Sequence, residues 1–199
     1  MADLEQLRRQ AAGCRNCGLW EHATQTVFGE GDPDAAVMLV GEQPGDQEDV
    51  RGRPFVGPAG NLLDRALQQA GIDRDSVYIT NAVKHFKWEP KGKRRIHKRP
   101  SAVEISACRA WLDGELDAVQ PRVVVAMGAT AAQALLGPQF RVTRDHGRPI
   151  ETTQGFEIVA TTHPSSVLRA PDEQARELGY AQLVDDLSVV AGILSADGS

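Results

Sequence analysis

Four short hydrophobic runs stand out along the chain, at residues 36–40, 77–80, 122–127 and 157–161. Each has the length of a buried strand and is continuously apolar, as strands of a parallel sheet require because both of their faces are covered. Helical patterns lie between and after these runs, at residues 59–70, 101–119, 129–136 and 172–194. We therefore expect one domain over residues 1–199, an α/β fold built as a three-layer α/β/α sandwich around a four-stranded parallel sheet.

Helix boundaries support this segmentation. Ser101 is a plausible N-cap, with Glu104 three residues later as its capping-box partner. Gly71 ends the first helical pattern, and Gly137–Pro138 ends the third. No internal repeat or interdomain linker interrupts the alternation, which favours a single domain.

Polar and glycine-rich residues follow each predicted strand. The segment Gly41-Glu42-Gln43-Pro44-Gly45 follows the first strand, Asn81 the second, Gly128 the third, and His163-Pro164-Ser165-Ser166 the fourth. In open parallel sheets, ligands bind at the carboxyl ends of the strands. The pattern therefore predicts a functional site along one edge of the sheet.

Taken singly, these residues allow ordinary readings as well as functional ones. Glu42 follows a strand where a carboxylate can face a reacting centre, but G-E-Q-P-G also suits a surface turn. Phe55 lies among prolines and glycines, so its ring could stack on a flat base or simply anchor the loop in the core. His163 could donate to a leaving group or be a structural histidine, and Arg169 could reach a nucleic-acid groove.

Charge and cysteine content narrow the class of protein. The net charge is −5, yet residues 84–99 hold eight Lys or Arg against one acid, a local pattern that suits either phosphate binding or a solvated loop. Three cysteines do not suit a disulfide scaffold, so a metal or cluster site is favoured. With a charged N-terminus and no run of about 18 apolar residues, we expect a cytoplasmic monomer without a membrane span.

The motifs together resemble the iron–sulfur uracil-DNA glycosylases. They are C-x-x-C at Cys14, G-E-Q-P-G, G-R-P-F-V-G-P-A-G, T-N-A-V-K and H-P-S, and they cover nearly the whole chain. The resemblance implies that Phe55 stacks on uracil, Asn81 reads its edge, His163 stabilises the departing base, and Glu42 acts at the sugar or on water. An Asn amide offers both a donor and an acceptor, which matches O4 and N3–H of uracil. Further substrate contacts are expected from Gly41, Gln43 and Ser165.

The same resemblance implies a [4Fe–4S] cluster. Cys14, Cys17 and Cys108 match three of the family's four cysteine ligands, and His85 stands where the remaining cysteine is expected. Imidazole can ligate iron in such centres, so His85 is the expected fourth ligand. Zinc held by three cysteines and one histidine is the alternative. The expected role of the cluster is structural.

The loop between residues 84 and 100 resembles one branch of the family, the UdgX type. It carries Lys93-Arg94-Arg95-Ile96-His97, and Gln43 stands where relatives often have alanine. In that branch the loop histidine bonds to the deoxyribose once uracil has left. The resemblance therefore implies uracil-containing DNA as the substrate, with flipped or single-stranded uracil, free uracil as the product, and a covalent bond from His97 to C1′.

Supporting roles follow from this reading. Arg95 is expected to tie the loop to Asp46 or Asp49, and Glu42 to orient His97 and accept its proton. The expected DNA contacts are Lys93, Arg94, Ser166 and Arg169. Two alternatives stay open: a turnover glycosylase in which Glu42 activates water, and a non-catalytic protein that binds uracil-containing or abasic DNA.

Overall fold

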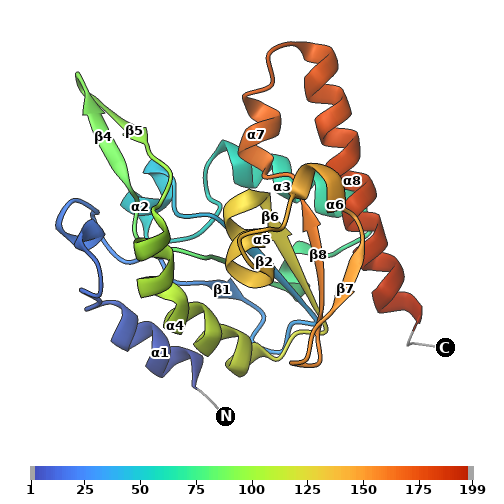
Figure 1. Cartoon of the computed structure of the whole chain (residues 1–199), viewed down its shortest axis with the longest axis horizontal. Coiled ribbons are helices and arrows are strands. Elements are labelled where there is room, and N and C mark those ends of the chain that lie inside the picture. The colour runs from blue at the N-terminus through green and yellow to red at the C-terminus, as the bar shows by residue number, and fades with distance from the viewer. Residues whose placement is uncertain (1–2, 197–199) are drawn as a thin grey trace.

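The computed structural model describes residues 3–196, which form a central sheet covered by helices on both faces (Figure 1). The sheet has six strands in the order β1-β3-β2-β6-β8-β7. Its four central strands are parallel and entirely or almost entirely buried: β3 (Val77–Asn81), β2 (Val37–Gly41), β6 (Val123–Met127) and β8 (Glu157–Thr161). The α/β class and the four central strands were predicted correctly from the apolar runs.

The predicted strand number was too low because the sheet continues at both edges. The strands β1 (Glu30–Gly31) and β7 (Pro149–Glu151) pair antiparallel with β3 and β8. They contain two and three residues, and most of these side chains are exposed or half-buried. Such short, partly polar segments carry no apolar run by which a sequence pattern could identify them.

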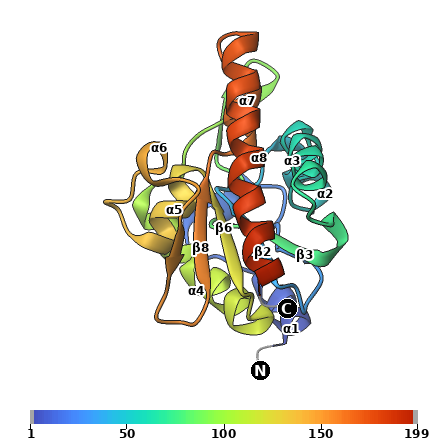
Figure 2. The same cartoon turned by 90° about the vertical axis from the view of Figure 1, so that its right-hand side faces the viewer.

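Helices lie on both faces of the sheet (Figure 2), and a separate hydrophobic layer lies beneath the helices of each face. One face is covered by α3 (Pro58–Gln69) and α8 (Glu173–Ala196). The other is covered by α4 (Ala102–Val119) and α5 (Gly128–Leu136), with α1 (Leu4–Ala11) packed on α4. The capping box between Ser101 and Glu104 is present at the start of α4.

The helix α8 also has the length and mean hydropathy that a membrane-crossing helix would need. Within it, Leu183, Leu187 and Val190 are fully buried against the sheet. Two aspartates, Asp185 and Asp186, lie in the middle of the same helix. One face of α8 therefore packs in the core of the protein.

The shorter elements lie mostly around the carboxyl edge of the parallel strands. They are η1 (Gly18–Glu21), α2 (Asp46–Arg51), η2 (Arg74–Ser76), α6 (Val142–Asp145) and α7 (Pro164–Leu168). A separate hairpin of β4 (Trp88–Lys91) and β5 (Arg94–His97) turns at Gly92, which has a φ of +61°. The hairpin projects from the body on the same side as α7 (Figure 1).

Candidate functional site

A cavity of about 580 Å³ opens at the carboxyl ends of the parallel strands. Gly41 ends β2 directly beside Asn81, which ends β3, while Gly128 and His163 follow β6 and β8. The topology therefore brings together the polar segments that follow all four strands. Among the predicted site residues, the lining includes Glu42, Gln43, Asp46, Phe55, Asn81, His97, His163, Ser165, Ser166 and Arg169.

The floor of the cavity is formed by the phenyl ring of Phe55 beside the side-chain amide of Asn81. A Cβ atom on Gly41 would clash with Oδ1 of Asn81 and would lie 2.7 Å from the Phe55 ring, so only glycine lets the two side chains approach here. Phe55 itself has a φ of +53°, a conformation that costs energy in a residue with a side chain. The carbonyl of Phe55 packs so closely on Gly60 that no other residue fits there. The loop thus fixes one orientation of the ring.

Asn81 is 2% exposed, and its Oδ1 is buried without a hydrogen-bond partner among the described residues. A buried acceptor without a partner costs free energy unless a ligand supplies a donor. The amide is therefore prepared to accept a hydrogen bond from a flat molecule stacked on Phe55.

His163 presents a second unsatisfied atom to the cavity. Its Nδ1 accepts hydrogen bonds from the Ser165 amide, at 3.1 Å, and from the Ser165 hydroxyl, at 2.7 Å. Burial lowers the pKa of His163 to about 4, although the Glu42 carboxylate acts in the opposite direction. A neutral ring that accepts at Nδ1 carries its hydrogen on Nε2. This Nε2 is buried without a partner among the described residues, so it can donate to a developing anion.

Glu42 and His97 meet at the mouth of the cavity. Nε2 of His97 lies 3.3 Å from Oε1 of Glu42, and the His97 side chain is 46% exposed. Burial raises the pKa of Glu42, but hydrogen bonds with His97 and Thr130 outweigh this effect and hold the pKa below its usual value. The carboxylate is therefore ionised at neutral pH beside an accessible imidazole.

The hairpin that carries His97 is held against α2 by Arg95. Arg95 Nε lies 2.6 Å from Asp46 Oδ1, and Arg95 Nη1 lies 2.6 Å from Asp49 Oδ2, so both carboxylates bind the same guanidinium. Its charge also lies over the rings of Phe86 and Trp88, 5.3 and 5.5 Å from their centroids. These contacts hold β5 in one position relative to the cavity.

Gln43 lines the cavity, but its amide is engaged elsewhere. Nε2 donates to the carbonyls of Lys87 and Lys98, both at 3.1 Å, and Oε1 accepts from the Lys87 amide at 3.2 Å. The two lysines flank the hairpin, one on each side. The side chain expected to contact substrate thus joins the two ends of the hairpin to β2.

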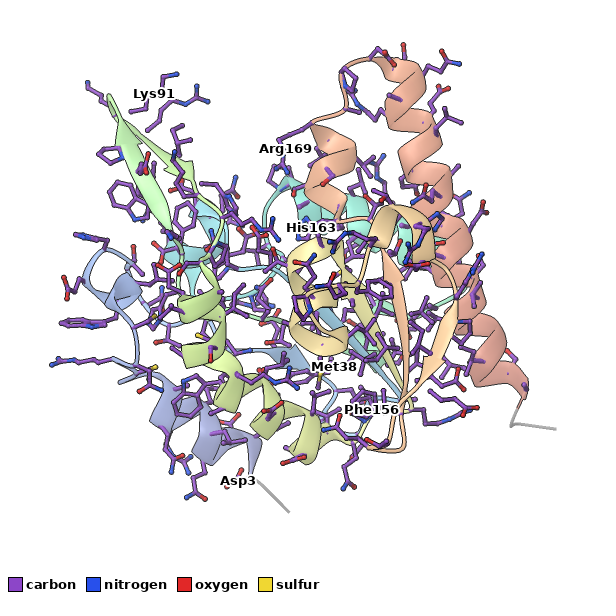
Figure 3. All side chains as sticks on the ribbon, in the orientation of Figure 1. Asp3, Met38, Lys91, Phe156, His163 and Arg169 are labelled. Atoms are coloured by element: carbon purple, nitrogen blue, oxygen red, sulfur yellow. The ribbon has the colours of Figure 1, made fainter. Side chains whose placement is uncertain are left out.

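The basic stretch of residues 84–99 is less basic at its surface than the sequence indicates. Lys84 is fully buried, while Lys87 and Lys98 form ion pairs with Glu104 and Glu89. The exposed cations are concentrated toward the hairpin turn, where Figure 3 labels Lys91. Lys93 and Arg94 lie beside that turn, and Arg169 lies across the cavity at the end of α7 (Figure 3).

The buried Lys84 organises the strand end that carries Asn81. Its ammonium donates to the Asn81 carbonyl at 2.7 Å and pairs with Oε2 of Glu115 at 2.5 Å. The other oxygen of Glu115 accepts from the Gly29 amide and the Tyr78 hydroxyl. A basic residue expected on the DNA-binding loop is instead part of a buried network.

We expect Lys84→Met to lower the free energy of unfolding by about 3–5 kcal/mol, because the Glu115 charge would be left buried without its partner. Chemical denaturation measures this loss. Asp113→Asn on the same helix is the control, since its pair with Arg109 is solvent-accessible and contributes about 0.3–0.5 kcal/mol. Equal losses in the two variants would contradict a structural role for the Lys84 pair.

The three cysteines converge on one place. Cys17 and Cys108 belong to one small apolar cluster with Trp111, whose indole N–H contacts Sγ of Cys14 at 3.2 Å. The amide of Lys84, the residue before His85, donates to Sγ of Cys108 at 3.4 Å. Within residues 3–196, however, no three such side chains are close enough to hold a single metal ion.

The protonation state of His85 suits a metal ligand that completes the set with the three cysteines. The Thr26 hydroxyl donates to the Ala11 carbonyl, so it accepts from Nε2 of His85 at 2.9 Å. The hydrogen of the neutral ring is then on Nε2, and burial lowers the pKa of His85. Nδ1 is left as a buried lone pair without a partner among the described residues, as a metal ligand requires.

Comparison with known proteins identifies a family for this chain. The family model "Uracil DNA glycosylase superfamily" matches residues 28–188. A type-4 uracil-DNA glycosylase of Thermotoga maritima is 34% identical over 196 residues, which cover 98% of this chain and 96% of that protein. One from Sulfurisphaera tokodaii is 36% identical and covers 86% and 79%. A type-5 uracil-DNA glycosylase of Thermus thermophilus is 30% identical and covers 84% and 81%.

Proposed function

Because the chain belongs to the uracil-DNA glycosylase superfamily and is a DNA glycosylase, we propose that it excises uracil from DNA and then bonds to the abasic sugar through His97. The excision follows from the relatives. The covalent step rests on one observation: an accessible imidazole at the mouth of the cavity, 3.3 Å from an ionised carboxylate. Arg95 and Gln43 support it by holding the loop in place.

Uracil enters the cavity only when it is turned out of the base stack. Phe55 then stacks on its face, and Asn81 Oδ1 accepts from its N3–H. Both roles are supported by the fixed ring and by the unsatisfied oxygen beside it. Lys93, Arg94, Ser166 and Arg169 hold the flanking phosphates.

The bond from C1′ to N1 of uracil breaks with its electron pair on the base. Nε2–H of His163 donates to the oxygen on which the negative charge develops, and the Glu42 carboxylate stabilises the cationic sugar. A lone pair of neutral His97 then forms the bond to C1′. The resulting imidazolium passes its N–H proton by way of Glu42 to solvent, which leaves an ionised Glu42 and a neutral N-alkylated ring that departs poorly.

The four ligands of a [4Fe–4S] cluster in this proposal are Cys14, Cys17, His85 and Cys108. The cluster would supply structural cross-linking, since uracil excision transfers no electron. It would join the N-terminal segment, the segment after β3 and α4. The convergent cysteines and the free Nδ1 of His85 support this set.

We expect the purified protein to be brown and to contain iron and inorganic sulfide, with visible absorbance typical of an iron–sulfur cluster. His85→Cys should keep this colour, because it supplies another suitable ligand, whereas Cys108→Ala should lose it. Metal analysis measures the outcome. Zinc in a colourless protein would contradict the cluster without affecting the glycosylase assignment.

Incubation with uracil-containing single-stranded DNA, followed by a denaturing gel, tests the function. A protein band that shifts and resists SDS is the expected result. Free abasic DNA with repeated turnover would instead favour Glu42-activated water, with His97 binding phosphate. Neither product would favour a non-catalytic binding protein.

A further inference from the structure

Thr130 lies in the first turn of α5 and lines the cavity, although the sequence motifs assign it no role. It is 2% exposed, and its hydroxyl makes two contacts. The hydroxyl donates to Oε2 of Glu42, and it accepts from Nε of Arg99 at 3.1 Å. Thr130 thus connects a residue that follows the hairpin to the carboxylate at the mouth of the cavity.

The direction of this chain of hydrogen bonds is determined by chemistry. A guanidinium has donors only, so the Thr130 oxygen must accept from Arg99, and its single hydrogen is then available for Glu42 alone. A second contact from Arg99 to Gln133, at 3.4 Å, holds the guanidinium on α5. Oε2 of Glu42 is therefore occupied, while Oε1 faces His97 at 3.3 Å.

From this geometry we propose that Thr130 and Arg99 are positioning residues that keep Glu42 ionised with one oxygen directed at the His97 ring. The inference rests on the proposed function and adds two residues that position its reactive pair, Glu42 and His97. Without the Thr130 hydroxyl, Glu42 can rotate, and its buried oxygen loses a donor. The neutral acid then becomes more favourable, so in acidic solution Glu42 loses the ability to accept a proton from His97 at a higher pH than in the wild type.

Charged and titratable groups from three segments act on Glu42. They are His97 on β5, His163 before α7, and Arg99 through Thr130 on α5. Burial raises the pKa of Glu42, and the hydrogen bonds from His97 and Thr130 lower it. Removal of the Thr130 donor must therefore raise the pKa of Glu42, so its carboxylate is lost at a higher pH.

Thr130→Val tests the proposal, because it keeps the shape of the side chain and removes the hydroxyl. Glu42 should stay ionised at neutral pH, so the loss of rate there comes from its misalignment with His97; a hydrogen bond to a charged group corresponds to a factor of about 10 to 100, which is the upper range of the expected fall in the rate of adduct formation. The acid limb of its pH profile should move up by about one unit. Thr130→Ser should restore both the rate and the profile.

Arg99→Gln provides a second variant at an exposed position, and we expect a smaller shift of the acid limb in the same direction. Arg176→Gln, an exposed residue of α8 outside the cavity lining, controls for the loss of one positive charge. Thermal unfolding verifies that each variant is folded. A wild-type pH profile in both Thr130→Val and Arg99→Gln would overturn the positioning role.

Failure of covalent trapping and failure of the positioning role would give different experimental results. If the wild-type protein gives turnover and no SDS-resistant band, covalent trapping is wrong. The pH profile of uracil release still tests Thr130 in that case, since an ionised Glu42 would then be needed to activate water. If the band forms and Thr130→Val matches the wild type, only the positioning role is wrong.

Discussion

His97→Ala is expected to abolish the SDS-resistant complex and to convert the protein into an enzyme that releases uracil over many turnovers. A well-oriented neighbouring group acts at an effective concentration of about 10⁵ M or more, so the imidazole should capture the sugar before water does. Without the ring, water fills the space beside Glu42 and hydrolyses the same cation. Denaturing gels and uracil release from excess substrate measure the two outcomes.

His22→Ala is a matched control, because His22 is also exposed and its hydrogen bond with the hairpin is made by its backbone carbonyl, which accepts from Trp88. This variant should form the complex as the wild type does. A resistant band that persists in His97→Ala would mean that another residue bonds to C1′. Loss of both the band and uracil release would mean that His97 is needed for excision itself.

His163→Ala is expected to slow uracil release by about 10²- to 10³-fold, the usual effect of removing one donor that faces a developing oxyanion. Both the covalent and the hydrolytic routes should slow equally, because His163 acts before they diverge. Single-turnover release of uracil, measured apart from adduct yield, gives this rate. Ser165→Ala should cost much less, since the backbone amide of Ser165 still donates to Nδ1.

The pH dependence of activity gives a second test of the role of His163. Burial lowers the pKa of His163 to about 4, so the ring is neutral at pH 7 and stays largely neutral well below an ordinary histidine pKa of 6.5. Protonation would remove the Nδ1 acceptor and break the contacts with Ser165. As the pH falls, activity should therefore persist below pH 6.5 and be lost only near pH 4. A His163-dependent transition near pH 6.5 would contradict the neutral, buried ring.

The fold was largely predictable because its four central strands are buried on both faces. Continuous apolar runs identify such strands, and each was located to within one residue at either end. The β4–β5 hairpin was not predictable as a strand pair. Its residues are mainly polar or charged, include Pro90, and bury little surface, so the same composition also describes a solvated loop.

Much of the site was predictable because the strand ends of a parallel sheet meet at one edge. Glu42, Asn81 and His163 adjoin strand ends, and the structure gathers them with Phe55 and His97 around one cavity. The role of Thr130 was not predictable, because it depends on a contact across 88 residues of chain. The burial of Lys84 was also missed, since its acidic partner, Glu115, lies on a helix far away in the sequence.

The sheet edge and the hairpin have different roles in the proposed mechanism. The sheet edge forms the excision pocket, and the hairpin carries the proposed nucleophile. Pairing of Trp88 with His97 and of Lys91 with Arg94 sets which side chain of β5 meets Glu42. Since alternate residues of a strand face opposite sides, inserting one residue into β5 ahead of Ile96 would present Ile96 to the carboxylate and turn the imidazole outward. In the proposed mechanism, self-capture is thus an attachment to an otherwise complete excision pocket, and a shift of a single residue in the exposed hairpin is expected to convert a protein that acts once into one that acts repeatedly.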